Sequence, residues 1–292
     1  MLDTVVIFSK DSTEKTRDGV SKLVNELHAR NIRILMHQRN DEIHYAPDNA
    51  PLEHFRSFDE VKAKPDMIFS VGGDGTFLET VIKVKDLGLP IAGVNTGRMG
   101  FLANIYADEI SQSVDMLQKG EYEIVDRCML ELIQPSGLFQ GNDSYALNEI
   151  TIQKSDLSMI TINVSVNDTY LNTYWCDGLI ISTATGSTAY NLSTGGPILS
   201  PEDESIIISP IAPHNLTIRP IIISGESRLR MQMEGRSNEF MTTVDFRSKK
   251  VPFGNEIVIE KAPRKIRTVM MKTRDFYSTL RNKLMWGADS RN

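Results

Sequence analysis

Short apolar runs alternate with segments of helical periodicity through the first part of the chain. Four of these runs have the length and apolar content of buried strands. They are Thr4–Phe8, Ile32–Met36, Met67–Val71 and Pro90–Val94. After the first run, the apolar stripe of an expected helix is formed by Val20, Leu23, Val24 and Leu27. The resulting order, β-α-β-loop-β-α-β, predicts a parallel sheet covered by helices.

The third apolar run leads directly into Gly72-Gly73-Asp74-Gly75. Glycines at a strand-to-helix turn let backbone N–H groups approach a ligand, and the amino end of a helix favours anions. We therefore expect a phosphate-binding loop here, with Thr76 capping the helix that follows. The positions with helical spacing in that helix are Leu78, Val81, Ile82 and Lys85.

Asp74 is the unusual member of this loop, because a carboxylate repels phosphates unless it has a task of its own. Two such tasks are accepting a proton and holding a metal ion. Asp-Gly is also ordinary turn chemistry, and this stretch alone leaves both interpretations open. Two familiar phosphate-binding fingerprints are excluded. The G-x-G-x-x-G pattern would need glycine at Leu78, and the Gly-Lys pair of a P-loop is absent from the chain.

Ligands of parallel sheets bind at the carboxyl ends of the strands. Gly72–Gly75 and Asn95–Phe101 both follow expected strands, so we expect these two loops to face one crevice. The intervening stretch His37–Phe58 is polar and contains two prolines, which predicts a flexible excursion. Its histidines, His44 and His54, are expected to be solvated rather than to act as ligands.

The apolar period changes beyond Gly120, where the helix expected over Asp108–Lys119 ends. Short strands separated by turn residues follow, which predicts mostly antiparallel sheet. These strands are Met129–Ile133, Tyr145–Ile152, Ile160–Val166, Ile206–Ile208, Ile221–Ile223, Leu229–Met233, Met241–Phe246 and Ile257–Ile259. The segment Val269–Trp286 regains helical character and suits packing on the first domain. We therefore predict an α/β nucleotide-binding domain with a parallel sheet over residues 1–120 and 269–292, and a β-rich, sandwich-like domain over 121–268.

Composition narrows the class of protein. A length of 292 residues is enough for two domains, and a net charge of −6 gives no electrostatic support for nucleic-acid binding. Local basic residues would have to bind any anionic substrate. Cys128 and Cys176 are too far apart for metal-ligand pairs and too few for a disulfide framework, which favours a reducing cytoplasm. No apolar run approaches the length of a membrane span, so we expect no membrane contact.

A second constellation lies in the β-rich half, between Cys176 and Pro197. An apolar strand leads into a glycine-broken run of hydroxyl residues, and a short helix is expected after it. The hydroxyl residues are Ser182, Thr183, Thr185, Ser187 and Thr188. Such a surface suits a flat polar ligand such as a nucleotide, with Tyr190 covering a base ring. A Ser/Thr-rich loop without a ligand is the alternative.

Asn148 and Glu149 form a polar pair between the apolar residues Leu147 and Ile150, in an expected strand. Asn148 can donate and accept hydrogen bonds, and Glu149 can accept two hydroxyl hydrogens, which suits the adjacent diols of a ribose. Polar residues at a strand end facing water are the alternative.

Taken together, these motifs resemble the signatures of NAD kinases, in the same order along the chain. The matching segments are Gly72-Gly73-Asp74-Gly75, Asn148-Glu149, Asp177–Thr183 and Thr185–Tyr190, with further matches at Asn95-Thr96-Gly97, Gly100-Phe101-Leu102 and Val244-Asp245. The likeness covers nearly the whole chain. The Gly-Gly-Asp-Gly loop is shared with diacylglycerol-type lipid kinases and phosphofructokinases, whereas the long hydroxyl run is not.

The resemblance implies the reaction ATP + NAD⁺ → ADP + NADP⁺, at a site in the cleft between the two domains. Asp74 would take the proton from the 2′-hydroxyl of the adenosine ribose as it attacks the γ-phosphoryl group. Amides of Gly72, Gly73 and Gly75, together with Mg²⁺, would hold the phosphate chain. The remaining substrate contacts implied are Phe101, Asn148, Glu149, Asp177, Thr185, Thr188, Ala189, Tyr190, Ser193 and Asp245. Asp177 would reach the nicotinamide end from a neighbouring subunit, which implies a homo-oligomer, commonly a tetramer built from dimers.

Three positions depart from the family pattern. Trp175 stands where some members that prefer oxidised NAD have arginine, so the choice between NAD⁺ and NADH stays open. Thr76 occupies a position that varies between ATP-only members and those that also use polyphosphate. Asp245 lacks the glycine that often follows it, which makes its assignment weaker.

Two alternatives of other kinds remain at the level of sequence. A lipid kinase would share the glycine loop, have an apolar acceptor channel and leave NAD unphosphorylated. A non-catalytic NADP(H) sensor would bind the dinucleotide through the hydroxyl run, and Asp74 would take part in no reaction.

Overall fold

The computed structural model describes residues 2–10, 13–37, 52–61, 64–84, 87–97 and 100–287. The expectations for His44, Lys85, Arg98 and Met99 therefore lie outside the described residues. The chain divides into two compact units. Unit 1 comprises Met1–Val125 and Arg267–Asn292, and unit 2 comprises Asp126–Ile266. No helix among the described residues has both the length and the apolar character needed to cross a membrane.

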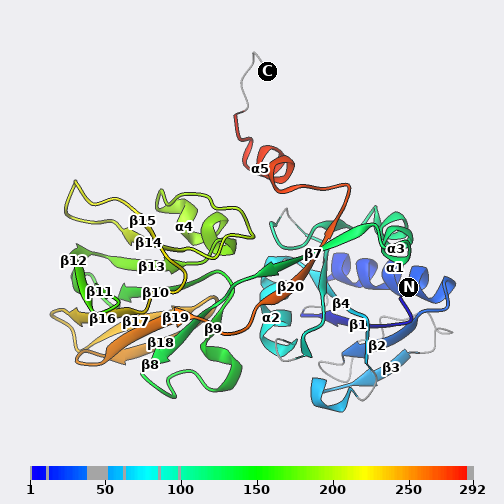
Figure 1. The fold of residues 1–292 in the computed structure, drawn as a ribbon. Coiled ribbons are helices and arrows are strands. Elements are labelled where there is room, and N and C mark those ends of the chain that lie inside the picture. Colours follow the sequence, from blue (N-terminus) through cyan, green and yellow to red (C-terminus); the bar gives the residue numbers. More distant parts are fainter. Residues whose placement is uncertain are drawn as a thin grey trace. The chain divides into compact units, whose positions relative to one another are not determined.

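Unit 1 is built on an eight-stranded sheet in the order β3-β2-β1-β4-β5-β20-β7, with β6 paired to β5 (Figure 1). The strands are β1 (Thr4–Ser9), β2 (Arg33–His37), β3 (Leu52–Phe55), β4 (Met67–Gly72), β5 (Ile91–Asn95), β6 (Ile105–Tyr106), β7 (Tyr122–Arg127) and β20 (Ile266–Met271). Neighbours from β3 through β20 pair in parallel, as does β6 with β5. The expected parallel sheet is confirmed.

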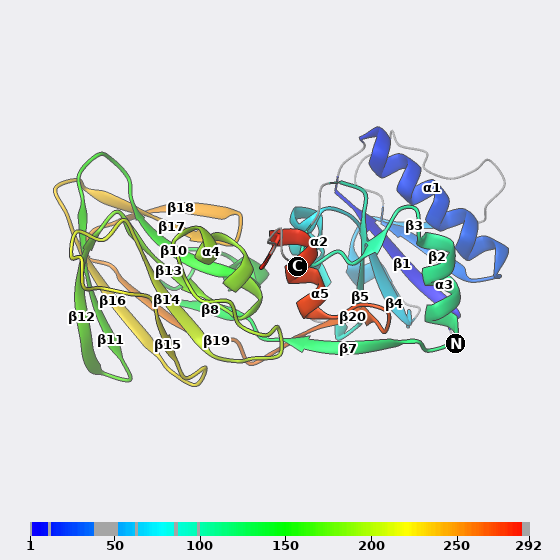
Figure 2. The ribbon, with the colours of Figure 1, turned by 90° about the horizontal axis from the view of Figure 1, so that it is seen from above.

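Helices cover this sheet, as its apolar strands require. The covering helices are α1 (Glu14–Ala29), α2 (Asp74–Val84) and α3 (Ile110–Gln118). The unit also contains α5 (Phe276–Leu284) and a short 3-10 helix, η1 (Phe58–Glu60). The apolar stripes of α1 and α3 share one core with Val5, Ile7 and Phe69 of the sheet. Helices α1 and α3 lie against each other, and α2 contacts β4 and β5 from the opposite side (Figures 1 and 2).

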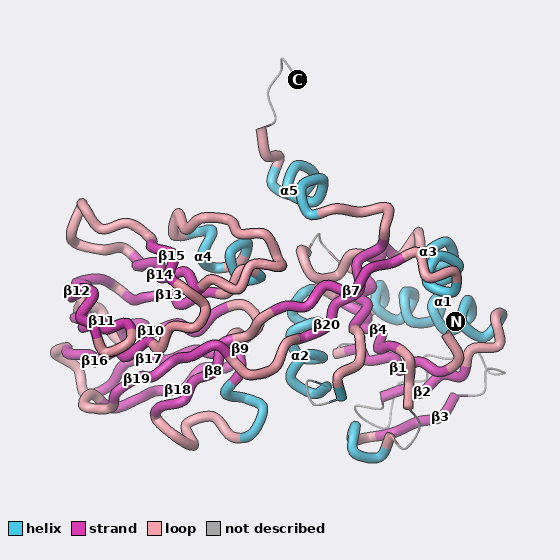
Figure 3. Tube along the Cα trace, in the orientation of Figure 1, coloured by secondary structure: helices cyan, strands magenta, loops and turns pink. Residues whose placement is uncertain are grey.

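Unit 2 is a sandwich of two six-stranded antiparallel sheets, ordered β15-β14-β13-β10-β17-β18 and β12-β11-β16-β19-β8-β9. Apolar side chains from both sheets form its core. The strands are β8 (Leu130–Gln134), β9 (Tyr145–Ala146), β10 (Glu149–Lys154), β11 (Ile160–Val166), β12 (Thr169–Cys176), β13 (Gly178–Ser182), β14 (Ile206–Ile211), β15 (Ile221–Ile223), β16 (Leu229–Glu234), β17 (Glu239–Val244), β18 (Arg247–Pro252) and β19 (Glu256–Lys261). Its few helical turns are η3 (Gly141–Ser144), η4 (Thr185–Thr188) and α4 (Tyr190–Ser193). Figure 3 shows how largely this unit consists of strands and loops.

Two segments differ from the sequence expectation. Leu52–Phe55, inside the expected flexible excursion, is strand β3 at the sheet edge, paired with β2. Ile266–Met271 is strand β20, although helical character was expected from Val269 onward. The helix starts only after Asp275, whose side chain accepts the Ser278 amide over 2.8 Å and so fixes the boundary.

Candidate active site

The glycine loop joins strand β4 to helix α2, and Asp74 is the first residue of that helix. The amides of Thr76 and Phe77 donate to the carbonyl of Gly73 and close the first helical turn. The prediction of a cap at Thr76 is therefore wrong, because the helix begins before it. Gly72 has a φ of +154°, and a Cβ at this position would lie 2.3 Å from Thr76 Oγ1. The side chain of Thr76 thus packs over the loop and requires glycine at position 72.

The Asp74 carboxylate accepts three backbone hydrogen bonds from the segment that follows β5. Phe101 N–H donates to Oδ2 over 2.7 Å, and the amides of Leu102 and Ala103 donate to Oδ1 over 3.1 and 3.3 Å. These bonds fix both oxygens of the half-buried side chain in one orientation and offset part of its charge. Oδ2 accepts only one of the three bonds, so it keeps acceptor capacity. A fixed carboxylate oxygen of this kind can accept a proton.

The same bonds confirm that the loops after β4 and β5 meet. A further contact joins them, because Thr96 N–H donates to the carbonyl of Gly72 over 3.2 Å. Two glycines of the first loop are open to a ligand. A Cβ on Gly73 or Gly75 would have no heavy atom within 4 Å, apart from its chain neighbours and, for Gly75, the backbone of its own helix. The space where a side chain would stand is therefore free at both glycines, as close backbone approach by a phosphate would require.

A second aspartate organises the turn before β10. Asp245 follows β17 in the left-handed conformation, with a φ of +51°. Its fully buried carboxylate accepts the amides of Leu147, Asn148 and Glu149 over 2.8 to 3.3 Å. Burial raises the pKa of Asp245, and these amides act in the opposite direction. The turn interrupts the expected strand Tyr145–Ile152, because its amides bond to a side chain instead of to a neighbouring strand.

Glu149 begins β10 and carries a buried carboxyl group, only 8% exposed. Burial, followed by the negative charge of Asp245, raises the pKa of Glu149 from 4.5 to about 8. Its Oε2 atom has no hydrogen-bond partner among the described residues. A buried polar atom without a partner is costly, and a hydroxyl-bearing ligand would satisfy it. Glu149 therefore does not match the alternative of a strand-end residue facing water, whereas the neighbouring Asn148 is half-buried.

Much of the hydroxyl run has a structural task within unit 2. Thr183 Oγ1 donates to the carbonyl of Leu147 over 2.6 Å and accepts the Gly186 amide over 3.0 Å. Ser187 Oγ accepts the Leu199 amide over 3.1 Å, and Ser182 Oγ donates to the carbonyl of Thr183. These three hydroxyls are buried, so they do not form the open polar surface that the sequence suggests. They position the turn of η4 instead.

Gly186 explains why glycine interrupts this run. A Cβ at Gly186 would lie 2.1 Å from the carbonyl oxygen of Asn148. The close approach places η4 directly against the turn that carries Asn148 and Glu149. Two of the sequence motifs are therefore one local structure.

The other expected contacts of unit 2 lie around this turn with different degrees of exposure. Thr185 is buried and accepts a hydrogen bond from the buried Arg127 over 3.2 Å. Tyr190 is 39% exposed, and its hydroxyl accepts from Gln153. Asp177 accepts from Lys154 over 2.7 Å. Of the rest, Thr188 and Ala189 are half-buried and Ser193 is exposed.

Asn191 is a residue whose importance the sequence does not reveal. Its fully buried amide donates to the carbonyls of Ser187 and Pro197 and accepts from Ser209, over 2.6 to 3.1 Å. A Cβ on Gly196 would lie 1.9 Å from its Oδ1. The sequence hints at this role only through the glycine pair Gly195-Gly196 after α4. Such a pair indicates that the backbone packs closely against another group, but it does not show that the group is Asn191.

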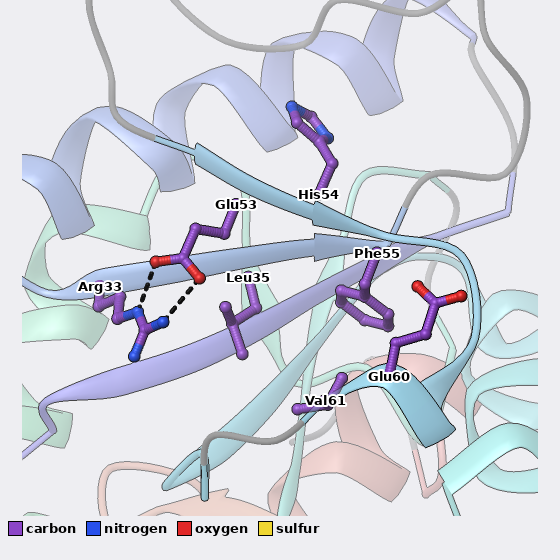
Figure 4. Close-up of a pocket in the computed structure, with 7 residues that line it drawn as sticks. All are labelled: Arg33, Leu35, Glu53, His54, Phe55, Glu60 and Val61. Carbon is purple, nitrogen blue, oxygen red and sulfur yellow. Dashed lines mark hydrogen bonds and ion pairs between the residues drawn. The ribbon is translucent and has the colours of Figure 1, made fainter.

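Cys128, Cys176 and His54 are not among the candidate site residues. Cys128 and Cys176 are buried and unpaired, and burial raises the pKa of Cys176 to about 11. His54 is exposed, as expected, but it lies on β3 beside a surface hollow of about 310 Å³ (Figure 4). The Arg33 guanidinium and the Glu53 carboxylate form two hydrogen bonds across one side of the hollow. None of the residues that line it belongs to the expected site.

Comparison with known proteins identifies the family. The model of the ATP-NAD kinase N-terminal domain matches residues 5–122, and that of the ATP-NAD kinase C-terminal domain matches residues 147–271. An NAD kinase of Cytophaga hutchinsonii is 43% identical over 230 residues, which cover 78% of each chain.

Solved structures show the same architecture. Yeast NADH kinase, crystallised with NADH, superposes with a TM-score of 0.84 over 99% of this chain and 89% of its own, at 24% identity, which bears on the fold alone. An NAD kinase from Archaeoglobus fulgidus in complex with ATP has a TM-score of 0.71 and 25% identity, covering 95% of this chain and 98% of its own. The α/β unit and the β-sandwich unit expected from the sequence are thus confirmed. The chain belongs to the NAD kinase family.

Proposed function

We propose that this protein is an NAD kinase that transfers the γ-phosphoryl group of ATP to the 2′-hydroxyl of the adenosine ribose of NAD. Membership of the family supports this proposal, as does the ATP complex of the Archaeoglobus relative. The observation that carries it is the Asp74 carboxylate, held by three backbone amides beside glycines open to a ligand.

In the proposed reaction, Asp74 Oδ2 takes the proton of the 2′-hydroxyl. The hydroxyl oxygen forms a bond to the γ-phosphorus, and the bond from that phosphorus to the leaving oxygen of ADP breaks. A base needs a fixed orientation and free acceptor capacity, and the three amides leave Asp74 with both. The amides of Gly72, Gly73 and Gly75 would contact the phosphate chain.

Magnesium is proposed as the cation that accompanies ATP. Among the residues that the structure describes, no three His, Cys, Asp or Glu side chains are grouped to hold a metal ion. Mg²⁺ is usually bound through substrate phosphates with one or two carboxylates, and it keeps several waters. The described residues fit that mode, since it needs no preformed group of protein ligands. When bound, the ion would neutralise charge on the phosphates.

The turn of unit 2 is proposed to bind the sugar. Glu149 Oε2 is a buried acceptor without a partner, and Asn148 beside it can donate and accept, so together they suit a pair of ribose hydroxyls. We propose that Asp245 acts by positioning them, because its own carboxylate is fully buried under the turn. The adenine side is assigned to Phe101, Thr185, Thr188, Ala189, Tyr190 and Ser193.

We further propose a homo-oligomer, a dimer or tetramer, in the cytoplasm. Asp177 follows Trp175 by two positions, just past the end of β12, which is an edge strand of its sheet. Trp175 is 53% exposed. Met159, before the paired strand β11, and Leu157 are also exposed. Exposed apolar side chains at a sheet edge favour burial against another chain. From such a contact, Asp177 would reach the nicotinamide end of a dinucleotide bound to the neighbouring subunit.

The decisive experiment supplies purified protein with NAD⁺ or NADH, each with ATP or polyphosphate, and measures formation of the 2′-phosphorylated dinucleotide. We expect turnover with ATP and Mg²⁺. The four combinations also decide acceptor and donor preference. Failure to phosphorylate either dinucleotide, with a lipid phosphorylated instead or with NADP(H) bound and nothing turned over, would contradict the proposal.

A further inference from the structure

A lysine near the end of the chain lies beside the Asp74 loop. The Nζ atom of Lys283 stands 5.2 Å from the ring centroid of Phe101. The backbone N–H of that same Phe101 donates to Asp74 Oδ2 over 2.7 Å. A cation, an aromatic ring and the candidate base therefore meet in unit 1, although Lys283 is far from the other two in sequence.

The position of Lys283 is fixed by helix α5. The side chain of Asp275 accepts the Ser278 amide, and the Ser278 hydroxyl accepts the Asp275 amide, so a capping box closes the first turn. Leu280 is the buried residue of the helix. Lys283 follows Leu280 by three positions and so shares its face, whereas Arg281 is exposed.

The charges around Lys283 leave its ammonium group available. Among the described residues, no carboxylate lies within ion-pair distance of it. Arg274, the other cation nearby, is paired with Glu109 and stacked on Tyr106 with its guanidinium 4.3 Å from the ring centroid. Lys283 is half-buried, and burial lowers its pKa, while the negative charge of Asp74 raises it and the charge of Arg274 lowers it. A half-buried ammonium without an ion pair gains from an anionic ligand.

A cation beside Asp74 would reduce the repulsion between its carboxylate and the phosphates of ATP. The protein has a net charge of −6, and its proposed base is a carboxylate that must work next to a triphosphate. Repulsion between these groups opposes binding and transfer unless positive charge lies close by. Phosphoryl-transfer sites commonly supply such charge from lysine or arginine as well as from the metal ion.

We infer that the Lys283 ammonium binds the phosphate oxygens of the donor nucleotide beside Asp74 and offsets their repulsion of its carboxylate. Helix α5 is then part of the binding site and not only a packing element. This inference rests on the proposed function, since it concerns the donor of that reaction.

The test compares Lys283→Met with Lys283→Arg and with Lys272→Met as a control. Methionine keeps an unbranched stem over Phe101 while removing the charge, and arginine restores the charge. Lys272 is an exposed lysine of the same unit, before α5. We expect Lys283→Met to lower kcat/KM for ATP by about 10- to 100-fold, since a hydrogen bond to a charged group is lost. We expect Lys283→Arg to recover much of the loss and Lys272→Met to match the wild type.

Further measurements distinguish three outcomes: the lysine inference is wrong, the proposed function is wrong, or the Lys283→Met variant does not fold. Equal kcat/KM for ATP in Lys283→Met and wild type overturns the inference, as does a loss that affects KM for NAD alone. If wild-type protein phosphorylates no dinucleotide, the proposed function fails, and calorimetric binding of ATP to wild type and Lys283→Met still tests the lysine. If Lys283→Met unfolds, ATP binding by folded Lys283→Arg and Lys283→Gln decides, with arginine expected to bind the more tightly.

Discussion

Gly100 stands where any side chain would displace the carboxylate of Asp74. A Cβ built on Gly100 would lie 1.9 Å from Oδ1 and 2.5 Å from Oδ2 of that residue. The three amides that orient the carboxylate follow directly, at positions 101 to 103. The backbone at Gly100 therefore packs directly against the Asp74 carboxylate. Glycine is required at position 100 because a side chain would overlap with Asp74, and not because of a turn conformation.

We expect Gly100→Ala to abolish turnover by moving Asp74. The measurement is a double-mutant cycle of kcat with Asp74→Asn. Because both changes remove the same correctly placed oxygen, the double variant should be about as slow as the slower single variant. Additive losses would contradict the view that Gly100 acts through Asp74. A thermal unfolding midpoint for each variant separates displacement of one side chain from loss of the fold.

Gly75→Ala should separate ligand binding from folding. The added Cβ has open space around it, and alanine is the better helix former by at most about 1 kcal/mol, so the free energy of unfolding should stay level or rise. If a phosphate approaches the backbone at this glycine, affinity for ATP should nevertheless fall. Calorimetric titration with ATP checks the affinity, and denaturant unfolding checks the stability. Unchanged affinity would remove Gly75 from the phosphate site.

Glu149 should make stability depend on pH in a direction opposite to that of most carboxylates. Its pKa is raised in the folded protein from 4.5 to about 8, so the folded state binds the proton more tightly between these values. Its contribution to stability is complete below about pH 4.5 and is lost as pH rises through about 8. Wild type should therefore lose free energy of unfolding over this range relative to Glu149→Gln, which carries no titrating proton.

Ligand binding should reverse that shift. Ribose hydroxyls donating to Glu149 Oε2 would favour the charged carboxylate and release its proton. Calorimetry of NAD binding near pH 7 in two buffers of different ionisation enthalpy measures this release. We expect up to one proton for wild type and none for Glu149→Gln. Equal values for the two proteins would contradict a contact between this carboxyl group and the sugar.

The architecture follows from features that a single sequence displays well. Buried parallel strands are continuous apolar runs, and the stripe of Val20, Leu23 and Val24 has one helical face, so β1, α1, β2 and β4 were predictable. Strands such as β12 and β18 were not expected, because their partly exposed, polar sequences have weak alternation. The sequence of β20 predicts the start of a helix, because the pairing with β5 that makes it a strand is a contact distant in sequence.

The sequence singles out candidate site residues but does not show which groups each of them contacts. Glycine placement and polar residues between apolar neighbours drew attention to Asp74 and Glu149. Nothing in the sequence indicates that Asp74 and Asp245 each accept three backbone amides, since the donors come from segments distant in the chain. The same limit hid Lys283, whose place depends on how α5 packs.

The most direct test of the central claim is the Asp74→Asn variant, assayed for ATP-dependent phosphorylation of NAD and, separately, for binding of NAD and ATP. Asparagine removes the proposed base. It also turns one acceptor oxygen into a donor that faces a backbone N–H, so a loss of stability of about 1 to 3 kcal/mol is expected as well. We expect kcat to fall by orders of magnitude while the folded variant still binds both nucleotides. Turnover close to that of the wild type would contradict the assignment of Asp74 as the base.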